Sequence, residues 1–208
     1  MAVCYVVGAG ECDSLPIKKQ NGDIIIAVDG GARHLERFGF KPDIFIGDFD
    51  SLGEVPVGEK VICLKPEKDV TDMHAAVDEG INNGFNDFVI FGATGGRLDH
   101  TLANIQLAAS LAEKGVNHII CSEYYCFKAV KNSFVEFDAS YEGYISAFSH
   151  TDSCAGVSIE GLKYELSNAT LLNTFALGVS NEFIGKKSKI SVEKGTLIIV
   201  YTNKKGEE

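Results

Sequence analysis

The sequence lacks the features of several protein classes. No window approaches roughly eighteen uninterrupted apolar residues, so we expect no membrane span. The first residues, MAVCYVVGAGEC, contain no basic leader, so we expect no signal peptide. Basic residues number 19 against 29 acidic ones, and they form no cluster. A net charge of −10 without a basic face argues against a nucleic-acid partner.

Cysteine motifs are also missing. The six cysteines are scattered and include no CxxC pair, and no His lies at zinc-ligand spacing from a cysteine pair. We therefore expect neither a zinc site nor a disulfide framework. Reduced thiols are typical of a cytoplasmic protein, which is the location we expect.

The first part of the chain has the pattern of an α/β domain. Short apolar, β-branched runs alternate with helix-like segments up to about residue 122, which predicts a mainly parallel sheet covered by helices. Gly84 and Gly115 are expected to end the last two helices. The expected strands are Val3–Val7, Asp23–Val28, Asp43–Ile46, Lys60–Leu64, Asp87–Phe91 and Asn117–Cys121, and the expected helices are 30–39, Val70–Asn83 and Leu98–Lys114.

The helical period disappears after about residue 122. The remaining runs are short and strand-like, and turn residues separate them, so they predict an all-β fold. We therefore expect an α/β domain at 1–122 and a smaller, sandwich-like all-β domain at 123–208. The expected strands of the second domain are Ser133–Phe137, Gly143–Phe148, Gly156–Ile159, Leu171–Leu172, Ser188–Val192 and Thr196–Tyr201.

Polar and glycine-rich loops follow consecutive strands of the predicted parallel sheet. Because the carboxyl ends of parallel strands share one edge, where ligands bind in such sheets, these loops are expected to form one crevice. The loops are VDGGAR (28–33), GDFDS (47–51), KPEKDVTD (65–72) and GATGGRLDH (92–100).

Two aspartates lie close together in the second of these loops. If the chain stays extended from Gly47 to Ser51, Asp48 and Asp50 face the crevice together and Phe49 turns towards the protein. An acidic surface turn would also explain such a pair. With other polar loops at the same edge we favour Mg²⁺, which prefers carboxylate oxygens, with Asp72 as a third ligand.

The other loops supply candidates for binding phosphate. Gly95 and Gly96 allow backbone N–H groups to approach a phosphate, and Arg97 suits a phosphate clamp. Asp99 can simply cap its helix, and His100 can be a satisfied, partly buried histidine.

Two further loops carry candidates that have ordinary structural explanations as well. Asp69 or Thr71 can cap the helix that follows, although capping does not explain Lys68 beside two acids. Asp29 is either part of a tight turn or a second residue that contacts a polyphosphate.

The ordered set of motifs resembles the thiamine pyrophosphokinase family. The motifs are DGGARHL, PDIFIGDFDS, KDVTD, GATGGRLDHTLANI and, in the second domain, LGVSNEF. The resemblance covers nearly the whole chain and implies transfer of the pyrophosphoryl group of ATP to thiamine, giving thiamine diphosphate and AMP. It also implies Mg²⁺ and a homodimer in which the β domain of one subunit helps to enclose thiamine. One departure from the family pattern is His74, where relatives often carry glutamate.

The resemblance also implies roles for particular residues. Asp48, Asp50 and Asp72 match the metal-binding acids, and together with Arg97 they are the expected catalytic residues. Ser180 and Asn181 match the segment associated with thiamine. The residues expected on the ATP side are Asp29, Lys68, Asp69, Gly95, Gly96, Arg97 and Asp99.

Two alternative functions stay open from the sequence. A pyrophosphokinase acting on another small alcohol, such as a pterin, would share the metal and ATP residues and differ in the β domain. A nucleotide-sensing module without turnover would also need these residues. No Walker A lysine is present, which favours AMP rather than ADP as the second product.

Overall fold

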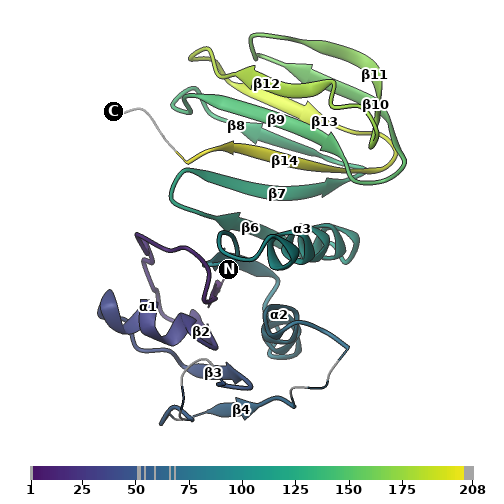
Figure 1. Ribbon diagram of the computed structural model, residues 1–208. Coiled ribbons are helices and arrows are strands. Elements are labelled where there is room, and N and C mark those ends of the chain that lie inside the picture. Colours follow the sequence, from purple (N-terminus) through teal and green to yellow (C-terminus); the bar gives the residue numbers. More distant parts are fainter. Residues whose placement is uncertain are drawn as a thin grey trace. The chain divides into compact units, whose positions relative to one another are not determined.

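The chain forms two compact units (Figure 1). The structure is a computed structural model that describes residues 2–50, 53, 55–58, 60–65, 67 and 69–203. Unit 1 comprises Met1–Leu107 and Val116–Glu123, and unit 2 comprises Ala108–Gly115 and Tyr124–Glu208. The domains predicted at 1–122 and 123–208 stay a prediction. Among the described residues, no helix is both long enough and apolar enough to span a membrane.

Unit 1 contains a parallel sheet, as the sequence predicts. Its strands follow the order β6–β5–β1–β2–β3–β4, and every neighbouring pair is parallel. Each strand begins and ends within one residue of its predicted bounds, because short buried apolar runs are clear strand signals. The strands are β1 (Cys4–Val7), β2 (Ile24–Val28), β3 (Ile44–Gly47), β4 (Val61–Cys63), β5 (Asp87–Phe91) and β6 (Asn117–Cys121).

The predicted helices are present, with somewhat shorter bounds. They are α1 (Gly31–Arg37), α2 (Asp72–Asn82) and α3 (Leu98–Glu113). Thr71 is the N-cap of α2, since its hydroxyl accepts a hydrogen bond from the N–H of His74 at 3.2 Å. Gly84 and Gly115 follow α2 and α3 with positive φ angles of 88° and 70°, a backbone conformation typical of helix ends.

Helices α1 and α2 cover opposite faces of the sheet (Figure 1). Val7 and Ile25 pack in one buried cluster with Leu35 of α1. On the other face, a Cβ placed on Gly80 of α2 would lie 2.6 Å from the ring of Phe88, so the helix and the sheet are in close contact there. Both faces are therefore closed, and the strand ends remain as the place for a site.

At the amino ends of the strands, aspartates bond to the backbone of a neighbouring strand. Asp23 precedes β2, and its Oδ1 accepts a hydrogen bond from the N–H of Val3 at 2.7 Å. Asp43 precedes β3, and its Oδ2 accepts one from the N–H of Ile25 at 2.7 Å. Each carboxylate satisfies an N–H group at the start of a strand, so these acids belong to the fold.

The strands of unit 2 pair antiparallel in two sets, as the strand-rich pattern predicts, and unit 2 also includes the end of α3 within Ala108–Gly115. One has the order β12–β9–β14–β7 and the other the order β11–β10–β13–β8. The sequence prediction missed β7 and β12, and shortened β11. The strands are β7 (Tyr125–Lys131), β8 (Phe134–Phe137), β9 (Tyr144–Ser149), β10 (Ser153–Glu160), β11 (Leu166–Leu172), β12 (Gly178–Glu182), β13 (Ser188–Ser191) and β14 (Thr196–Thr202).

The expectation of reduced thiols is wrong for two cysteines. Cys121 and Cys126 are disulfide-bonded, whereas Cys4, Cys12, Cys63 and Cys154 are free. The spacing between the two bonded residues matches no common cysteine motif, so their pairing was not predictable from the sequence.

Candidate functional site

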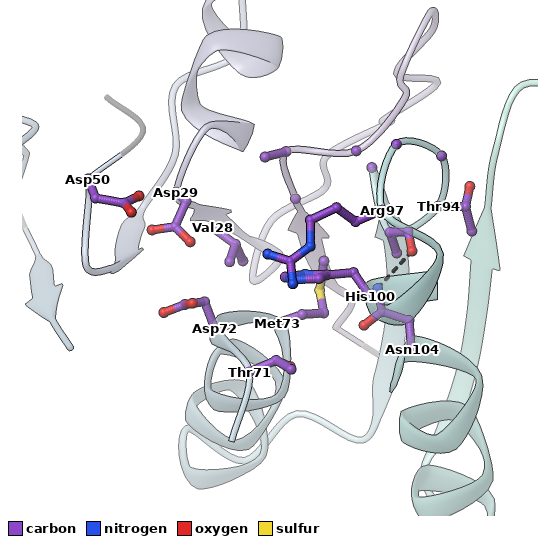
Figure 2. A pocket seen from close by; sticks show the side chains of 17 residues that line it. Val28, Asp29, Asp50, Thr71, Asp72, Met73, Thr94, Arg97, His100 and Asn104 are labelled. Atoms are coloured by element: carbon purple, nitrogen blue, oxygen red, sulfur yellow. Dashed lines mark hydrogen bonds between the residues drawn. The ribbon is translucent and has the colours of Figure 1, made fainter. Parts of the chain in front are cut away.

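A cavity of about 290 Å³ opens at the carboxyl edge of the sheet in unit 1 (Figure 2). Loops that follow β1, β2, β3 and β5 contribute to it, together with the first turns of α2 and α3. The predicted convergence of separate loops at this edge is therefore confirmed. The lining residues are Gly8, Ala9, Gly10, Val28, Asp29, Asp50, Thr71, Asp72, Met73, Gly92, Ala93, Thr94, Gly95, Gly96, Arg97, His100 and Asn104.

Two glycine-rich loops lie against each other along one wall of the cavity. The N–H of Gly10 donates to the carbonyl of Gly92 at 2.8 Å, and the N–H of Glu11 donates to the carbonyl of Thr94 at 2.8 Å. A Cβ on Gly10 would lie only 2.4 Å from the carbonyl oxygen of Thr94. Glycine is therefore needed at position 10 for this close approach.

Three carboxylates from three different elements line the cavity. Asp29 follows β2, Asp50 follows β3, and Asp72 opens α2. Figure 2 shows these side chains on one side of the cavity and Arg97 on the other. Opposite charges thus face a common space, an arrangement that can hold an anion together with a cation.

Asp48 does not line the cavity. Phe49 has a positive φ of 59°, so the chain is not extended between the two aspartates and the alternation expected there is wrong. Phe49 is turned into the protein, as expected, and is 3% exposed. Asp48 instead accepts a hydrogen bond through Oδ1 from the N–H of Asp50 at 3.2 Å, which ties the turn together.

The carboxylates fit Mg²⁺ only together with further oxygen ligands. Among the residues that the structure describes, no group of three or more His, Cys, Asp or Glu side chains could hold a metal ion by itself. Mg²⁺ is commonly held by one or two carboxylates, with phosphate oxygens and water completing its shell. Asp50 and Asp72 provide that number of carboxylates at the cavity.

Arg97 is held by the aspartate two residues after it. Its Nη2 donates to Oδ2 of Asp99 at 2.6 Å and its Nε donates to Oδ1 at 3.1 Å. These bonds from Arg97 lower the pKa of Asp99 to about 2. Asp99 itself does not line the cavity, and its two hydrogen bonds fix the orientation of the Arg97 guanidinium.

The remaining residues singled out in the sequence are either absent from the cavity lining or outside the part of the chain that the structure describes. Lys68 falls outside the described residues. Asp69 is exposed and is not part of the cavity lining. His74, the departure from the family pattern, is also outside the lining, and its Nε2 lies 3.7 Å from Oδ2 of Asp78.

Asn104 is a lining residue that the sequence analysis missed. It is 6% exposed, and its Nδ2 donates to the carbonyl oxygen of Ala93 at 2.7 Å, which ties α3 to the loop after β5. An asparagine buried in an apolar helix needs a partner, so its place among Leu107, Ala108 and Leu111 could have revealed it.

The two residues predicted on the thiamine side lie in unit 2. Asn181 is buried, its Oδ1 accepts from the N–H of Tyr164 at 2.9 Å, and its Nδ2 donates to the carbonyl of Tyr164 at 2.6 Å. Ser180 is exposed and has a positive φ of 59°. Asn181 therefore holds the backbone at Tyr164, whereas Ser180 is an exposed residue.

Both units match known protein-family models. The model described as "Thiamin pyrophosphokinase, catalytic domain" matches residues 17–120, which include the lining residues from Val28 to Asn104. The model described as "Thiamin pyrophosphokinase, vitamin B1 binding domain" matches residues 133–197.

Individual relatives agree with the family models. A thiamine pyrophosphokinase of Bacillus subtilis is 30% identical over 183 residues, covering 84% of this chain and 85% of the relative. A crystal structure of thiamine pyrophosphokinase from Bacillus subtilis superposes with a TM-score of 0.86 at 26% identity, covering 97% and 99% of the two chains. The corresponding structure from Geobacillus thermodenitrificans gives 0.83 at 27% identity, covering 97% and 98%.

Proposed function

Because the chain belongs to the thiamine pyrophosphokinase family, we propose that the cavity of unit 1 is where its reaction takes place. The enzyme transfers the pyrophosphoryl group of ATP to the primary hydroxyl of thiamine and releases AMP. The observation that supports this site most directly is the meeting of Asp50, Asp72 and Arg97 at one cavity. The match of unit 2 to a vitamin B1 binding domain favours thiamine over a pterin alcohol.

Different residues of the cavity are proposed to make different contacts with a polyphosphate. Gly95 and Gly96 have positive φ angles of 83° and 63°, a backbone conformation that other residues rarely adopt. In this conformation the loop can turn its N–H groups towards a phosphate. Arg97, oriented by Asp99, neutralises phosphate charge. Lys68 and Asp69 stay predicted contacts on the ATP side.

Asp50 and Asp72 are the residues proposed to hold Mg²⁺, with Asp48 as a neighbouring acid. When bound, the ion neutralises phosphate charge and polarises the phosphorus that is attacked. The protein's own contribution is to place the hydroxyl of thiamine in line with the β-phosphorus and to keep the AMP oxygen opposite, since phosphoryl transfer depends mainly on such positioning.

A turnover assay tests this function. ATP labelled separately at its β- and γ-phosphates is incubated with thiamine, Mg²⁺ and the protein. Both labels are expected in thiamine diphosphate, with AMP formed in equal amount. ADP with only the γ-label in the thiamine product would contradict the pyrophosphoryl transfer, and no product at all would favour a nucleotide-sensing module.

A homodimer is proposed for the assembled enzyme. Unit 2 exposes large apolar side chains around the start of β12, among them Leu172, Phe175, Leu177 and Val179. Exposed apolar side chains gathered within a short segment favour a protein partner, and a second copy is the partner that the family resemblance implies. Sedimentation should give about twice the chain mass of 22.4 kDa. An active monomer would contradict the proposed homodimer. The cytoplasmic location of the enzyme stays a prediction.

A further inference from the structure

The carboxylate of Asp29 takes part in the turn that carries the two neighbouring aspartates. Its Oδ1 accepts a hydrogen bond from the backbone N–H of Phe49 at 3.3 Å. The backbone N–H of Asp29 donates to the carbonyl of Ile46 at 3.1 Å, so the end of β2 is joined to the end of β3 and to the turn beyond it.

The glycine before the turn makes room for this carboxylate. Gly47 has a φ of 153°, and a Cβ placed on it would lie 1.7 Å from Oδ1 of Asp29. No residue with a side chain can therefore occupy position 47 while Asp29 keeps its place. The sequence pattern Gly-Asp-Phe-Asp is thus matched to an aspartate on the neighbouring strand.

The turn needs such support because its backbone is strained. Phe49 is a bulky residue with a φ of 59°, a conformation that non-glycine residues adopt rarely and at a cost in free energy. Its side chain is buried and its N–H is bound to Asp29, and these two contacts hold the conformation. As a result Asp50, and not Asp48, lines the cavity.

We propose that Asp29 is a positioning residue, which acts through the backbone N–H of Phe49 to direct Asp50 into the cavity. This role rests on the proposed function, and it differs from the contact with ATP expected from the sequence. It requires an acceptor oxygen at position 29 rather than a negative charge. Asparagine can supply that oxygen, and alanine cannot.

The first test is hydrogen exchange in the protein without metal or substrate. The amide of Phe49 is followed by NMR in the wild type, Asp29→Asn and Asp29→Ala. We expect Asp29→Ala to exchange at Phe49 at least about tenfold faster than the wild type, while Asp29→Asn stays within about threefold. Unchanged exchange in Asp29→Ala would overturn the proposal, because the bond would then not hold the turn.

The second test is turnover by the same variants with ATP, thiamine and Mg²⁺. Supporting groups of this kind typically contribute about 10- to 100-fold, so we expect that loss in Asp29→Ala and a loss below about threefold in Asp29→Asn. Asp13→Asn, which removes an exposed charge from the same unit, serves as the control for net charge. An equally large loss in Asp29→Asn and Asp29→Ala would overturn the proposal, because the charge itself would then be required.

The two tests also separate this inference from the proposed function. If the wild type forms no thiamine diphosphate, the proposed function fails, while the exchange of Phe49 still shows whether Asp29 holds the turn. If Asp29→Ala does not fold, Asp29→Asn alone decides, since lost turnover with a protected Phe49 amide would contradict the positioning role.

Discussion

Aspartates stand at both ends of the parallel strands in unit 1, and the two groups have different surroundings. At the amino ends, Asp23 and Asp43 bond to backbone N–H groups that start neighbouring strands. At the carboxyl ends, Asp50 and Asp72 line a cavity opposite Arg97. The same side chain therefore supports the fold at one edge and is available to ligands at the other.

The difference follows from the direction of the strands. A strand presents N–H groups at its beginning, and a carboxylate there satisfies them. The carboxyl ends lead into loops and helix starts, where like charges gather only if a ligand compensates for their repulsion. Substitutions at the two edges should consequently separate stability from activity.

The largest expected effect is on activity at the carboxyl edge. Asp50→Asn or Asp72→Asn should lower kcat/KM by about 100-fold or more, because each removes a charge proposed to hold Mg²⁺. The midpoint of thermal unfolding should stay close to that of the wild type. Steady-state assays at limiting Mg²⁺ and thermal scans measure both quantities.

Asp48→Asn is the matched comparison for that prediction. Asp48 is in the same turn but outside the cavity lining, so its loss should be clearly smaller than that of Asp50→Asn. Equal losses in the two variants would show that both acids hold the ion, as the sequence alone suggested.

Arg97 should give the next largest effect. Arg97→Ala should lower kcat/KM by about 10- to 100-fold, because it removes the cation proposed to face the phosphates. Arg97→Lys should recover only part of this loss, since an ammonium group cannot reproduce the two bonds to Asp99. If both variants kept wild-type KM for ATP and kcat, Arg97 would have no role in the site.

At the amino edge the expected effect is on stability. Asp23→Ala leaves the N–H groups of Val3 and Gln20 without their acceptor and should lower the free energy of unfolding by about 1–3 kcal/mol. Activity below the unfolding transition should not change. Urea unfolding measures the difference, with Asp13→Ala as the control for an exposed aspartate. A loss of activity without a loss of stability would contradict the contrast between the edges.

The sequence predicted unit 1 better than unit 2 for a physical reason. The central strands β1, β2 and β3 of unit 1 are largely buried, so they are continuous apolar runs with clear ends. Strand β12 has no such pattern, because Ser180 with its positive φ and a register shift between Gly178 and Asn181 interrupt it. Its apolar Val179 is exposed and its polar Asn181 is buried, which reverses the usual signal.

Similar limits apply to the candidate site. Which loops meet was predictable, because strand order and direction place their carboxyl ends at one edge. Which aspartate lines the cavity was not, because it depends on the φ of Phe49, and that conformation is set by Asp29 from a neighbouring strand. A contact between residues that are far apart in the sequence produces no local sequence pattern from which it could be predicted.

The smallest expected effect concerns the pH dependence of stability at the amino edge. The N–H group of Val3, and to a lesser extent that of Gln20, lowers the pKa of Asp23 below its ordinary value, because these hydrogen bonds stabilise the charged carboxylate. A carboxylate whose pKa is lower in the folded state than in the unfolded state contributes stability above its unfolded pKa. This contribution is lost as the pH falls through the folded pKa.

The difference in unfolding free energy between the wild type and Asp23→Asn should therefore be constant from about pH 7 to pH 5 and should shrink below about pH 4. Urea unfolding of both proteins across this range gives the measurement. A difference that grows on acidification would mean that the folded protein binds the protonated form of Asp23 more strongly, and the assignment of this acid to the fold as a charged acceptor would be wrong.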